Sequence, residues 1–257
     1  MALLRALRSF AAVVSCLALL GVVAPLSLYL FYVPRIAFRP ERASELGTEW
    51  VSHIARTLVA LMRLGGATFT IEGEIDCNQA GVIIMNHQSV LEIPPLIYML
   101  RPRLPRFVAR SRYARSIPTV SRAIRYLDCI VIDPRRDRAG SVLAIQRAAE
   151  QGLRHAVMLF PEGHRTSDGE IAPFRPAGMT ELLTGRRLPV WTIVSDGFWR
   201  HRKVMDTFFG LGQVRSRMKV IDKVISPEKP DELPAFIEER RQTLIRELAK
   251  LRAEATT

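Results

Sequence analysis

The sequence has few cysteines, and none of them lies in a pattern that binds a metal or predicts a disulfide. Cys16, Cys77 and Cys129 are scattered along a chain of 257 residues. Disulfide-rich secreted domains and zinc modules depend on regularly spaced cysteines, so both classes are excluded. We expect three reduced, buried thiols in a protein that faces the cytosol, and no bound metal.

Acidic residues are also few beside basic ones, with 25 against 37 and a formal net charge of +12. Basic proteins often bind nucleic acid, but the sequence has no zinc-finger or helix-turn-helix pattern and no basic motif interleaved with aromatic residues. We therefore expect no nucleic-acid partner. Eleven arginines against three aspartates lie between Arg101 and Gly140. Such a segment can contact anionic lipid headgroups, an acidic carrier protein or the phosphates of coenzyme A, and the sequence leaves these open.

No charged residue occurs between Ser9 and Pro34, and the stretch from Phe10 to Val33 is strongly apolar. As a helix it would be ~36 Å long at ~1.5 Å per residue, against ~30 Å for the hydrocarbon core of a bilayer. A cleaved signal peptide is disfavoured because the run is too long and no clear small-residue cleavage site follows it. We expect an uncleaved membrane segment.

The direction of this segment stays open because arginines flank both of its ends, so the positive-inside rule does not discriminate. Pro25 is expected to break the helix. A kinked segment that enters one leaflet therefore fits at least as well as a simple span. Residues 44–64 follow with apolar side chains at helical spacing, which predicts an interfacial helix, a helix that packs on the soluble core, or both.

After residue 65 the pattern changes to alternating strands and helices. This alternation predicts an α/β fold in which a mixed β-sheet is flanked by helices, preceded by N-terminal membrane-associated helices. We expect residues 1–65 to form the membrane-associated part and residues 66–257 the α/β domain. Strands are predicted at residues 67–72, 81–85, 106–109, 129–132, 155–160, 189–194 and 218–225, with the last at an edge of the sheet.

The first chemical motif is Asn86-His87-Gln88-Ser89-Val90-Leu91-Glu92, directly after a predicted buried strand. His87 can act as a general base if Glu92 accepts its Nδ1–H and stabilises the imidazolium, which leaves Nε2 free to take a hydroxyl proton. A spacing of five does not align two residues on a helix, so a tight turn must bring Glu92 back. The alternative is a structural loop histidine with Asn86 and Ser89 capping the turn.

The second motif is Phe160-Pro161-Glu162-Gly163-His164-Arg165-Thr166, about 75 residues later and again after an apolar run. Gly163 lets the backbone approach a ligand, Arg165 can bind phosphate oxygens, and Glu162 can accept a hydrogen bond from a glycerol hydroxyl. The alternative is a turn with a surface ion pair. Either motif alone is weak evidence for a site, but the two together indicate one.

These motifs, with Pro173–Gly178 and the strand after Leu188, resemble those of the glycerolipid acyltransferase family of lysophosphatidic acid acyltransferases, from about Phe38 to Glu239. The resemblance implies transfer of an acyl chain from acyl-CoA or acyl carrier protein to lysophosphatidic acid, with no metal, cofactor or acyl-enzyme. The membrane and the lysophospholipid acceptor would be partners, and the catalytic domain would face the cytoplasm. It makes His87 the general base, oriented by Glu92, and places the substrate at Glu162, Gly163 and Arg165.

Three residues depart from the family pattern. Glu92 replaces the usual aspartate, His164 stands where threonine or serine is usual, and Pro134 occupies the position of a phosphate-binding arginine, with Arg135 displaced by one. His164 and Arg135 are therefore further substrate-binding candidates. Glycerol 3-phosphate, another lysophospholipid or a lyso-aminolipid remain alternative acceptors. A catalytically inactive membrane-binding homologue is the alternative from another class, because a fold alone does not give activity.

Overall fold

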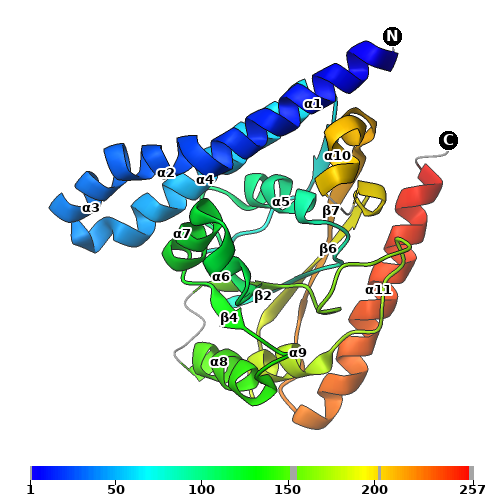
Figure 1. Ribbon diagram of the computed structural model, residues 1–257. Helices are drawn as coiled ribbons and strands as arrows, with labels where there is room; N and C mark the ends of the chain where they lie inside the picture. The colour runs from blue at the N-terminus through cyan, green and yellow to red at the C-terminus, as the bar shows by residue number, and fades with distance from the viewer. Residues whose placement is uncertain (1, 151–154, 202–203, 255–257) are drawn as a thin grey trace.

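The structure is a computed structural model that describes residues 2–150, 155–201 and 204–254. Within these residues the strands form a seven-stranded sheet in the order β1-β7-β6-β2-β5-β3-β4. β6 and β7 are antiparallel and the other neighbours are parallel, which confirms a mixed sheet flanked by helices (Figure 1). The strands are β1 (Thr68–Glu72), β2 (Gly81–Met85), β3 (Arg106–Arg110), β4 (Ile130–Ile132), β5 (Ala156–Leu159), β6 (Pro189–Asp196) and β7 (Arg215–Ile225).

The prediction that the last strand lies at an edge is wrong. β7 pairs with β6 on one side and with β1 on the other, so β1 forms the edge. Charged side chains give β7 the composition of an edge strand, but here they find partners across the sheet. Arg217 and Lys219 lie 3.2 and 3.9 Å from carboxylate oxygens of Glu72 on β1.

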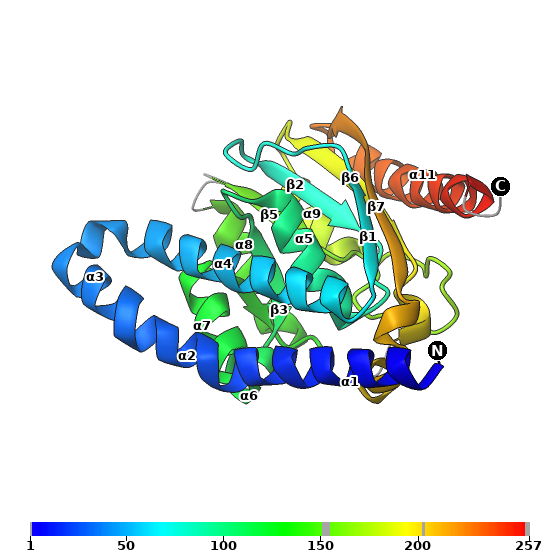
Figure 2. The ribbon, with the colours of Figure 1, turned by 90° about the horizontal axis from the view of Figure 1, so that it is seen from above.

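Helices cover both faces of the sheet, which explains the unbroken apolar sequences of the central strands. All five residues of β2 are buried. Ile83 and Met85 belong to one hydrophobic core, while Val82 and Ile84 belong to the core on the other face. Figure 2 places α4 and α11 on opposite sides of the sheet. The first core includes α4 (Ala43–Leu64) and α5 (Ile93–Leu100); the second includes α8 (Arg138–Glu150), α9 (Pro176–Leu183) and α11 (Leu233–Glu254).

The N-terminal apolar segment remains helical through Pro25, so the predicted break is absent. α1 (Ala2–Ala18), α2 (Ala24–Ser27) and α3 (Val33–Phe38) follow one another through π-helical turns at Leu19–Val23 and Leu28–Tyr32. Pro25 stands in the first turn of α2, directly after a π turn. Pro25 has no N–H to donate to the preceding turn, and the wider π turn relieves the contact of its ring with the preceding carbonyls.

This segment, Leu3–Phe38, is long and apolar enough to cross a membrane, and only 28% of an apolar 18-residue stretch within it is buried, which makes it a candidate for membrane association. α4 returns beside it (Figure 2) and contributes Trp50, Val59 and Met62 to the first core, which confirms the prediction that residues 44–64 pack on the sheet domain. The Trp50 Nε1–H donates to Ser27 Oγ at 3.2 Å and so links α4 to α2.

One hydrophobic core contains side chains from both sides of the boundary predicted after residue 65, and the division into two domains stays a prediction. The three cysteines are free, as expected, but only Cys77 is buried; Cys16 and Cys129 are partly exposed. Short helices α6 (Tyr113–Ser116) and α7 (Pro118–Tyr126) lie between β3 and β4, and α10 (Val204–Gly210) precedes β7.

Candidate active site

The two sequence motifs meet at one edge of the sheet. β2 and β5 are parallel neighbours, and each motif begins where its strand ends, so the carboxyl ends of both strands deliver them to the same place. Two hydrogen bonds donated by backbone N–H groups tie the motifs together. The His87 N–H donates to Glu162 Oε1 at 2.8 Å, and the Thr166 N–H donates to the His87 carbonyl at 2.8 Å.

A single 3₁₀ turn, Val90–Glu92, brings Glu92 back to the histidine. Ser89 caps this turn by accepting a hydrogen bond from the Leu91 N–H at 3.3 Å. His87 Nδ1 and Glu92 Oε1 are in hydrogen-bond contact, as the spacing in the sequence predicted. The Gln88 N–H lies 3.2 Å from both Glu92 oxygens. The turn therefore compensates for a spacing that would not align the two residues on a regular helix.

The environment of this pair favours a histidine that accepts a proton at Nε2. Glu92 is fully buried, and burial raises the pKa of its carboxyl, while the charge and hydrogen bond of His87 and the Gln88 N–H oppose the rise. The His87 ring stacks on Phe160 with centroids 4.0 Å apart, and 18% of its side chain is exposed. Among the described residues Nε2 has no hydrogen-bond partner. The ring is thus fixed at Nδ1 and open at Nε2.

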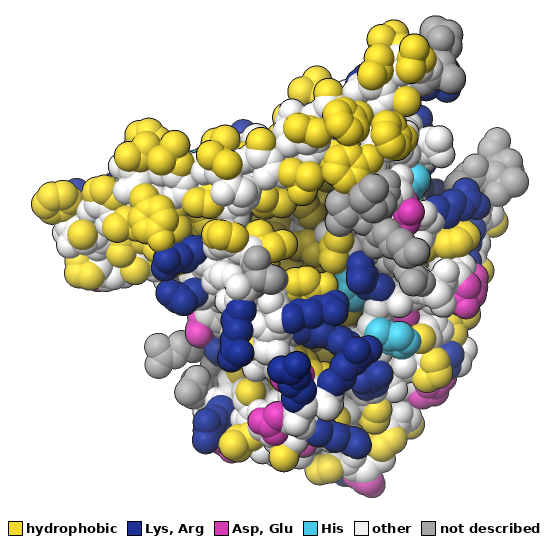
Figure 3. Space-filling view, viewed as in Figure 1, with side chains coloured by type: hydrophobic (Ala, Val, Ile, Leu, Met, Phe, Trp, Pro, Cys, Tyr) yellow, Lys and Arg dark blue, Asp and Glu magenta, His cyan; other side chains and the backbone are white. Residues whose placement is uncertain are grey.

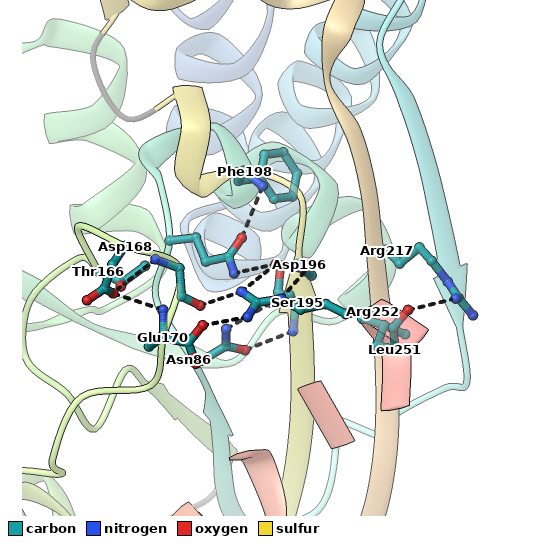
Figure 4. Close-up of polar contacts among 12 residues, drawn as sticks. Asn86, Thr166, Asp168, Glu170, Ser195, Asp196, Phe198, Arg217, Leu251 and Arg252 are labelled. Carbon is teal, nitrogen blue, oxygen red and sulfur yellow. Dashed lines mark hydrogen bonds and ion pairs between the residues drawn. The ribbon is translucent and has the colours of Figure 1, made fainter. Parts of the chain in front are cut away.

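Side chains on either side of His87 fasten its loop to the end of β6 (Figure 4). Asn86 Nδ2 donates to the Ser195 carbonyl, and the Ser195 N–H donates back to Asn86 Oδ1, both at 2.8 Å. Gln88 Nε2 donates to Asp196 Oδ1 at 2.9 Å, and Gln88 Oε1 accepts from the Phe198 N–H at 3.0 Å. Asn86, considered above as a cap of the local turn, therefore bonds instead to a strand that is distant in the sequence.

Glu162 is placed inside the loop structure. It is 1% exposed, and each of its oxygens accepts one backbone N–H, from His87 at 2.8 Å and from Ala172 at 2.9 Å. Burial raises the pKa of its carboxyl, and these two hydrogen bonds oppose the rise. Contact of Glu162 with a glycerol hydroxyl stays a prediction. What the geometry provides is a carboxylate that holds the histidine loop against the second motif.

The remaining predicted residues of the second motif surround this carboxylate. Gly163 has a φ of +69°, and a Cβ there would lie 2.9 Å from Cδ of Arg175, so only glycine fits without strain or displacement. His164 is exposed, with its Nδ1 at 2.8 Å from the Glu162 carbonyl. Arg165 is half-buried. Substrate contact by Gly163, His164 and Arg165 stays a prediction.

Arginines from three other segments gather next to Gly163. The Arg110 guanidinium at the end of β3 donates to the Gly163 carbonyl. Burial lowers the pKa of Arg110, and the like charges of Arg112, Arg135 and Arg175 lower it further. Arg135, exposed in the turn after β4, therefore reaches the neighbourhood of the site although Pro134 displaces it by one position. In Figure 3 basic side chains gather on this face of the molecule.

The last turn of α11 reaches the loop that follows the second motif through Arg252 (Figure 4). Its Nη1 donates to Glu170 Oε1 at 2.6 Å, its Nη2 donates to the Gly169 carbonyl at 2.7 Å, and its Nε lies 3.2 Å from Asp196 Oδ2. Asp196 is also the partner of Gln88. A chain of polar contacts thus runs from the C-terminal helix to the residue beside His87.

Sequence reasoning missed Arg110, Arg175, Arg252 and Gln88 as members of this site. Arg110 had one usable signal, because it ends a strand at the edge where the motifs lie. Arg175 lies in the loop that resembles the family pattern after the second motif. Gln88 lies inside the first motif, beside His87, whereas Arg252 gave no local signal. Within residues 2–150, 155–201 and 204–254, no three His, Cys, Asp or Glu side chains gather as metal ligands would, and the expectation of a metal-free reaction remains a prediction.

Comparisons with known proteins give the family and the fold of the chain. The model of the family described as Acyltransferase matches residues 67–195, just over half of the chain. The bovine (Bos taurus) 1-acyl-sn-glycerol-3-phosphate acyltransferase alpha is 26% identical over 172 residues. That match covers 65% of this chain and 58% of the bovine protein.

The fold is also that of a solved structure. The crystal structure of the 1-acyl-sn-glycerophosphate (LPA) acyltransferase PlsC from Thermotoga maritima superposes with a TM-score of 0.70. The alignment covers 98% of both chains at 19% sequence identity. At that identity the likeness establishes the architecture, including the N-terminal helices that precede the sheet.

Proposed function

This chain belongs to the acyltransferase family, and from that membership we propose that it transfers a fatty acyl chain from acyl-CoA or acyl carrier protein to the free hydroxyl of lysophosphatidic acid, giving phosphatidic acid. One observation carries the proposal: the buried His87–Glu92 pair leaves Nε2 open at the edge where Arg110 and its neighbours collect positive charge.

The reaction follows from the orientation of the imidazole. Glu92 accepts the Nδ1–H, so Nε2 takes the proton from the acceptor hydroxyl as its oxygen attacks the thioester carbonyl. The tetrahedral oxyanion collapses, the carbon–sulfur bond breaks, and the proton on Nε2 passes to the leaving thiolate. Glu92 stabilises the imidazolium between these steps. No covalent bond to the enzyme forms, and general base catalysis of this kind contributes ~10²–10⁴-fold.

Positive charge beside the histidine supports a phosphate on the acceptor. Arg110 is positioned by the Gly163 carbonyl, and Arg135 and Arg175 are close enough to lower its pKa. Arginine pairs well with phosphate because its planar guanidinium can bind two oxygens at once. The displacement of Arg135 in the sequence therefore does not remove it from this group. An acceptor with a phosphomonoester uses these charges best.

Membrane association by the N-terminal helix is part of the proposal. The N-terminal part of the helix packs on the sheet domain, where Ser9 Oγ accepts from the Gly212 N–H at 3.0 Å, and farther along the helix packs on α4, whose Trp50 donates to Ser27. Apolar side chains such as Leu7, Leu30 and Phe31 are exposed. We place this face in the bilayer leaflet that faces the cytoplasm, beside the catalytic domain. Labelling of cysteines introduced at positions 3 and 40 from opposite faces of the membrane would contradict entry into one leaflet.

Acyl transfer by the full chain in detergent tests the reaction. Lysophosphatidic acid, glycerol 3-phosphate, another lysophospholipid and a lyso-aminolipid are compared as acceptors, each with acyl-CoA and acyl carrier protein as donor. His87→Ala is expected to lower turnover ~10²–10⁴-fold, and His155→Ala, at an exposed histidine, to leave it near wild type. Near-wild-type turnover by His87→Ala would contradict the general base. Activity on the lyso-aminolipid alone would contradict lysophosphatidic acid as the acceptor, but it would not contradict acyl transfer.

A further inference from the structure

A cavity lies apart from both motifs, where the N-terminal helices meet α6 and α7. Its volume is about 270 Å³. Leu28 and Tyr29 line one side of the cavity, and Ala114, Arg115, Arg122 and Arg125 line the other. None of these residues belongs to the His87–Glu92 turn or to the second motif, and the proposed reaction gives the cavity no role.

The cavity is strongly basic because three arginines line it. The lining includes no aspartate or glutamate, and within the described residues Arg115, Arg122 and Arg125 form no ion pair. Arg122 Nη2 donates to the Tyr29 hydroxyl at 2.6 Å, and its guanidinium lies 5.6 Å from the centroid of that ring. Arg122 and Arg125 are three apart on α7 and share one face. Positive charge held together without a protein counter-ion favours an anionic ligand.

The surroundings of the cavity indicate where that anion is found. Val22, Leu26 and Leu30 are exposed on the same stretch of helix that contributes Leu28 and Tyr29. Figure 3 shows this apolar surface directly above the basic side chains. An apolar surface that borders a basic one matches the boundary between the acyl chains and the headgroups of a bilayer, where lipid phosphates lie.

We propose that this cavity binds the phosphate of an anionic bilayer phospholipid that is not a substrate. Arg115, Arg122 and Arg125 receive the phosphate oxygens, and Leu28 with the Tyr29 ring contacts the glycerol and the first carbons of the acyl chains. A lipid held there bridges α2 and its following π turn to α7. The proposal rests on membrane association by the N-terminal helix, but it is independent of acyl transfer.

Binding of the full chain to vesicles tests the site. Partition is measured into phosphatidylcholine vesicles with and without phosphatidylglycerol, and the ratio of the two partition coefficients is the readout because it cancels the apolar contribution of the helix. Arg115→Gln, Arg122→Gln and Arg125→Gln together are expected to lower the ratio on the order of 100-fold, since each basic residue at an anionic surface contributes about fivefold. The control removes three charges elsewhere, by Arg147→Gln, Arg187→Gln and Lys229→Gln, and should change the ratio little.

A charge-neutral variant separates the cavity from its general surface charge. Ala114→Leu fills the cavity and is expected to lower the ratio while circular dichroism and thermal unfolding stay as in the wild type. An unchanged ratio in this variant, or an equal loss in the control, would show that surface charge alone binds the vesicle and would overturn the proposal. A ratio that excess free coenzyme A lowers as far as the triple substitution does would assign the cavity to the acyl donor. Failure of the wild type to bind neutral vesicles would instead contradict membrane association by the helix.

Discussion

The substitution Glu162→Gln tests whether the Glu162 carboxylate holds the His87 loop in place or binds substrate. In the wild type both oxygens accept backbone N–H groups, from His87 and Ala172. Glutamine has the same shape but only one acceptor, so one of these buried N–H groups would face an amide NH₂ group and lose its partner. The free energy of unfolding is expected to fall by about 1–3 kcal/mol, the usual cost of an unpaired buried polar group.

The pH dependence of this loss has a definite sign. Burial raises the folded-state pKa of Glu162 above its ordinary value of 4.5. In the window between 4.5 and the raised value the folded state binds more protons than the unfolded state, so wild-type stability from this group decreases as pH rises. Glutamine does not titrate. This decrease in stability with rising pH is therefore expected in the wild type and absent from Glu162→Gln.

Chemical denaturation of the detergent-solubilised chain at several pH values measures both effects, with Glu150→Gln at an exposed glutamate as the control. Turnover should fall with stability, by up to about 100-fold, because the His87 loop is no longer held in place. A variant that unfolds like the wild type, keeps its kcat and shows a raised KM for the acceptor would refute this reasoning. Glu162 would then bind substrate directly.

Other substitutions test separate parts of the site. Glu92→Gln should lower kcat ~10²–10⁴-fold in steady-state acyl transfer, because an amide no longer selects the Nδ1–H tautomer of His87. Glu92→Asp keeps the charge and should retain more activity. An equal loss in both variants would exclude a role for the charge. Arg110→Leu should raise the KM for lysophosphatidate roughly 10–100-fold and Arg110→Lys less, with no effect on monoacylglycerol; a loss shared by both acceptors would contradict phosphate binding. Arg252→Leu should lower the free energy of unfolding by about 1 kcal/mol, since its ion pairs to Glu170 and Asp196 are partly screened by solvent, and an unchanged denaturation midpoint would show that the contacts to α11 are not stabilising.

The central sheet could be predicted because its strands are buried on both faces. β2 and β5 are short unbroken apolar runs, and the two chemical motifs begin directly after them. β7 was misplaced because its charged side chains are typical of an edge, and only the structure reveals that Glu72 on β1 pairs with them. Pro25 misled for a similar reason. Local sequence does not report that a π turn precedes it.

The contact between His87 and Glu92 could be predicted because both residues lie within one turn of the chain. His87 and Glu92 need only a local 3₁₀ turn to meet. The arginines could not be found in this way. Arg110 and Gly163 are 53 positions apart, and the folding of β3 beside β5 brings them together. Thus the residues proposed to carry out the reaction have a short-range signal, while those expected to select the substrate come from distant strands and loops.

This difference bears on the choice of acceptor. Burial lowers the pKa of Arg110, and the like charges of Arg112, Arg135 and Arg175 lower it further, so holding these arginines together has a cost. A phosphomonoester carries up to two negative charges, so its binding relieves the repulsion among these arginines. Because the free protein already bears this unfavourable repulsion, its relief adds to the affinity for the phosphate. A zwitterionic lyso-aminolipid would offset less of it, because its own cation adds to the repulsion. The arrangement of the arginines therefore favours lysophosphatidate even though one of them has moved in the sequence.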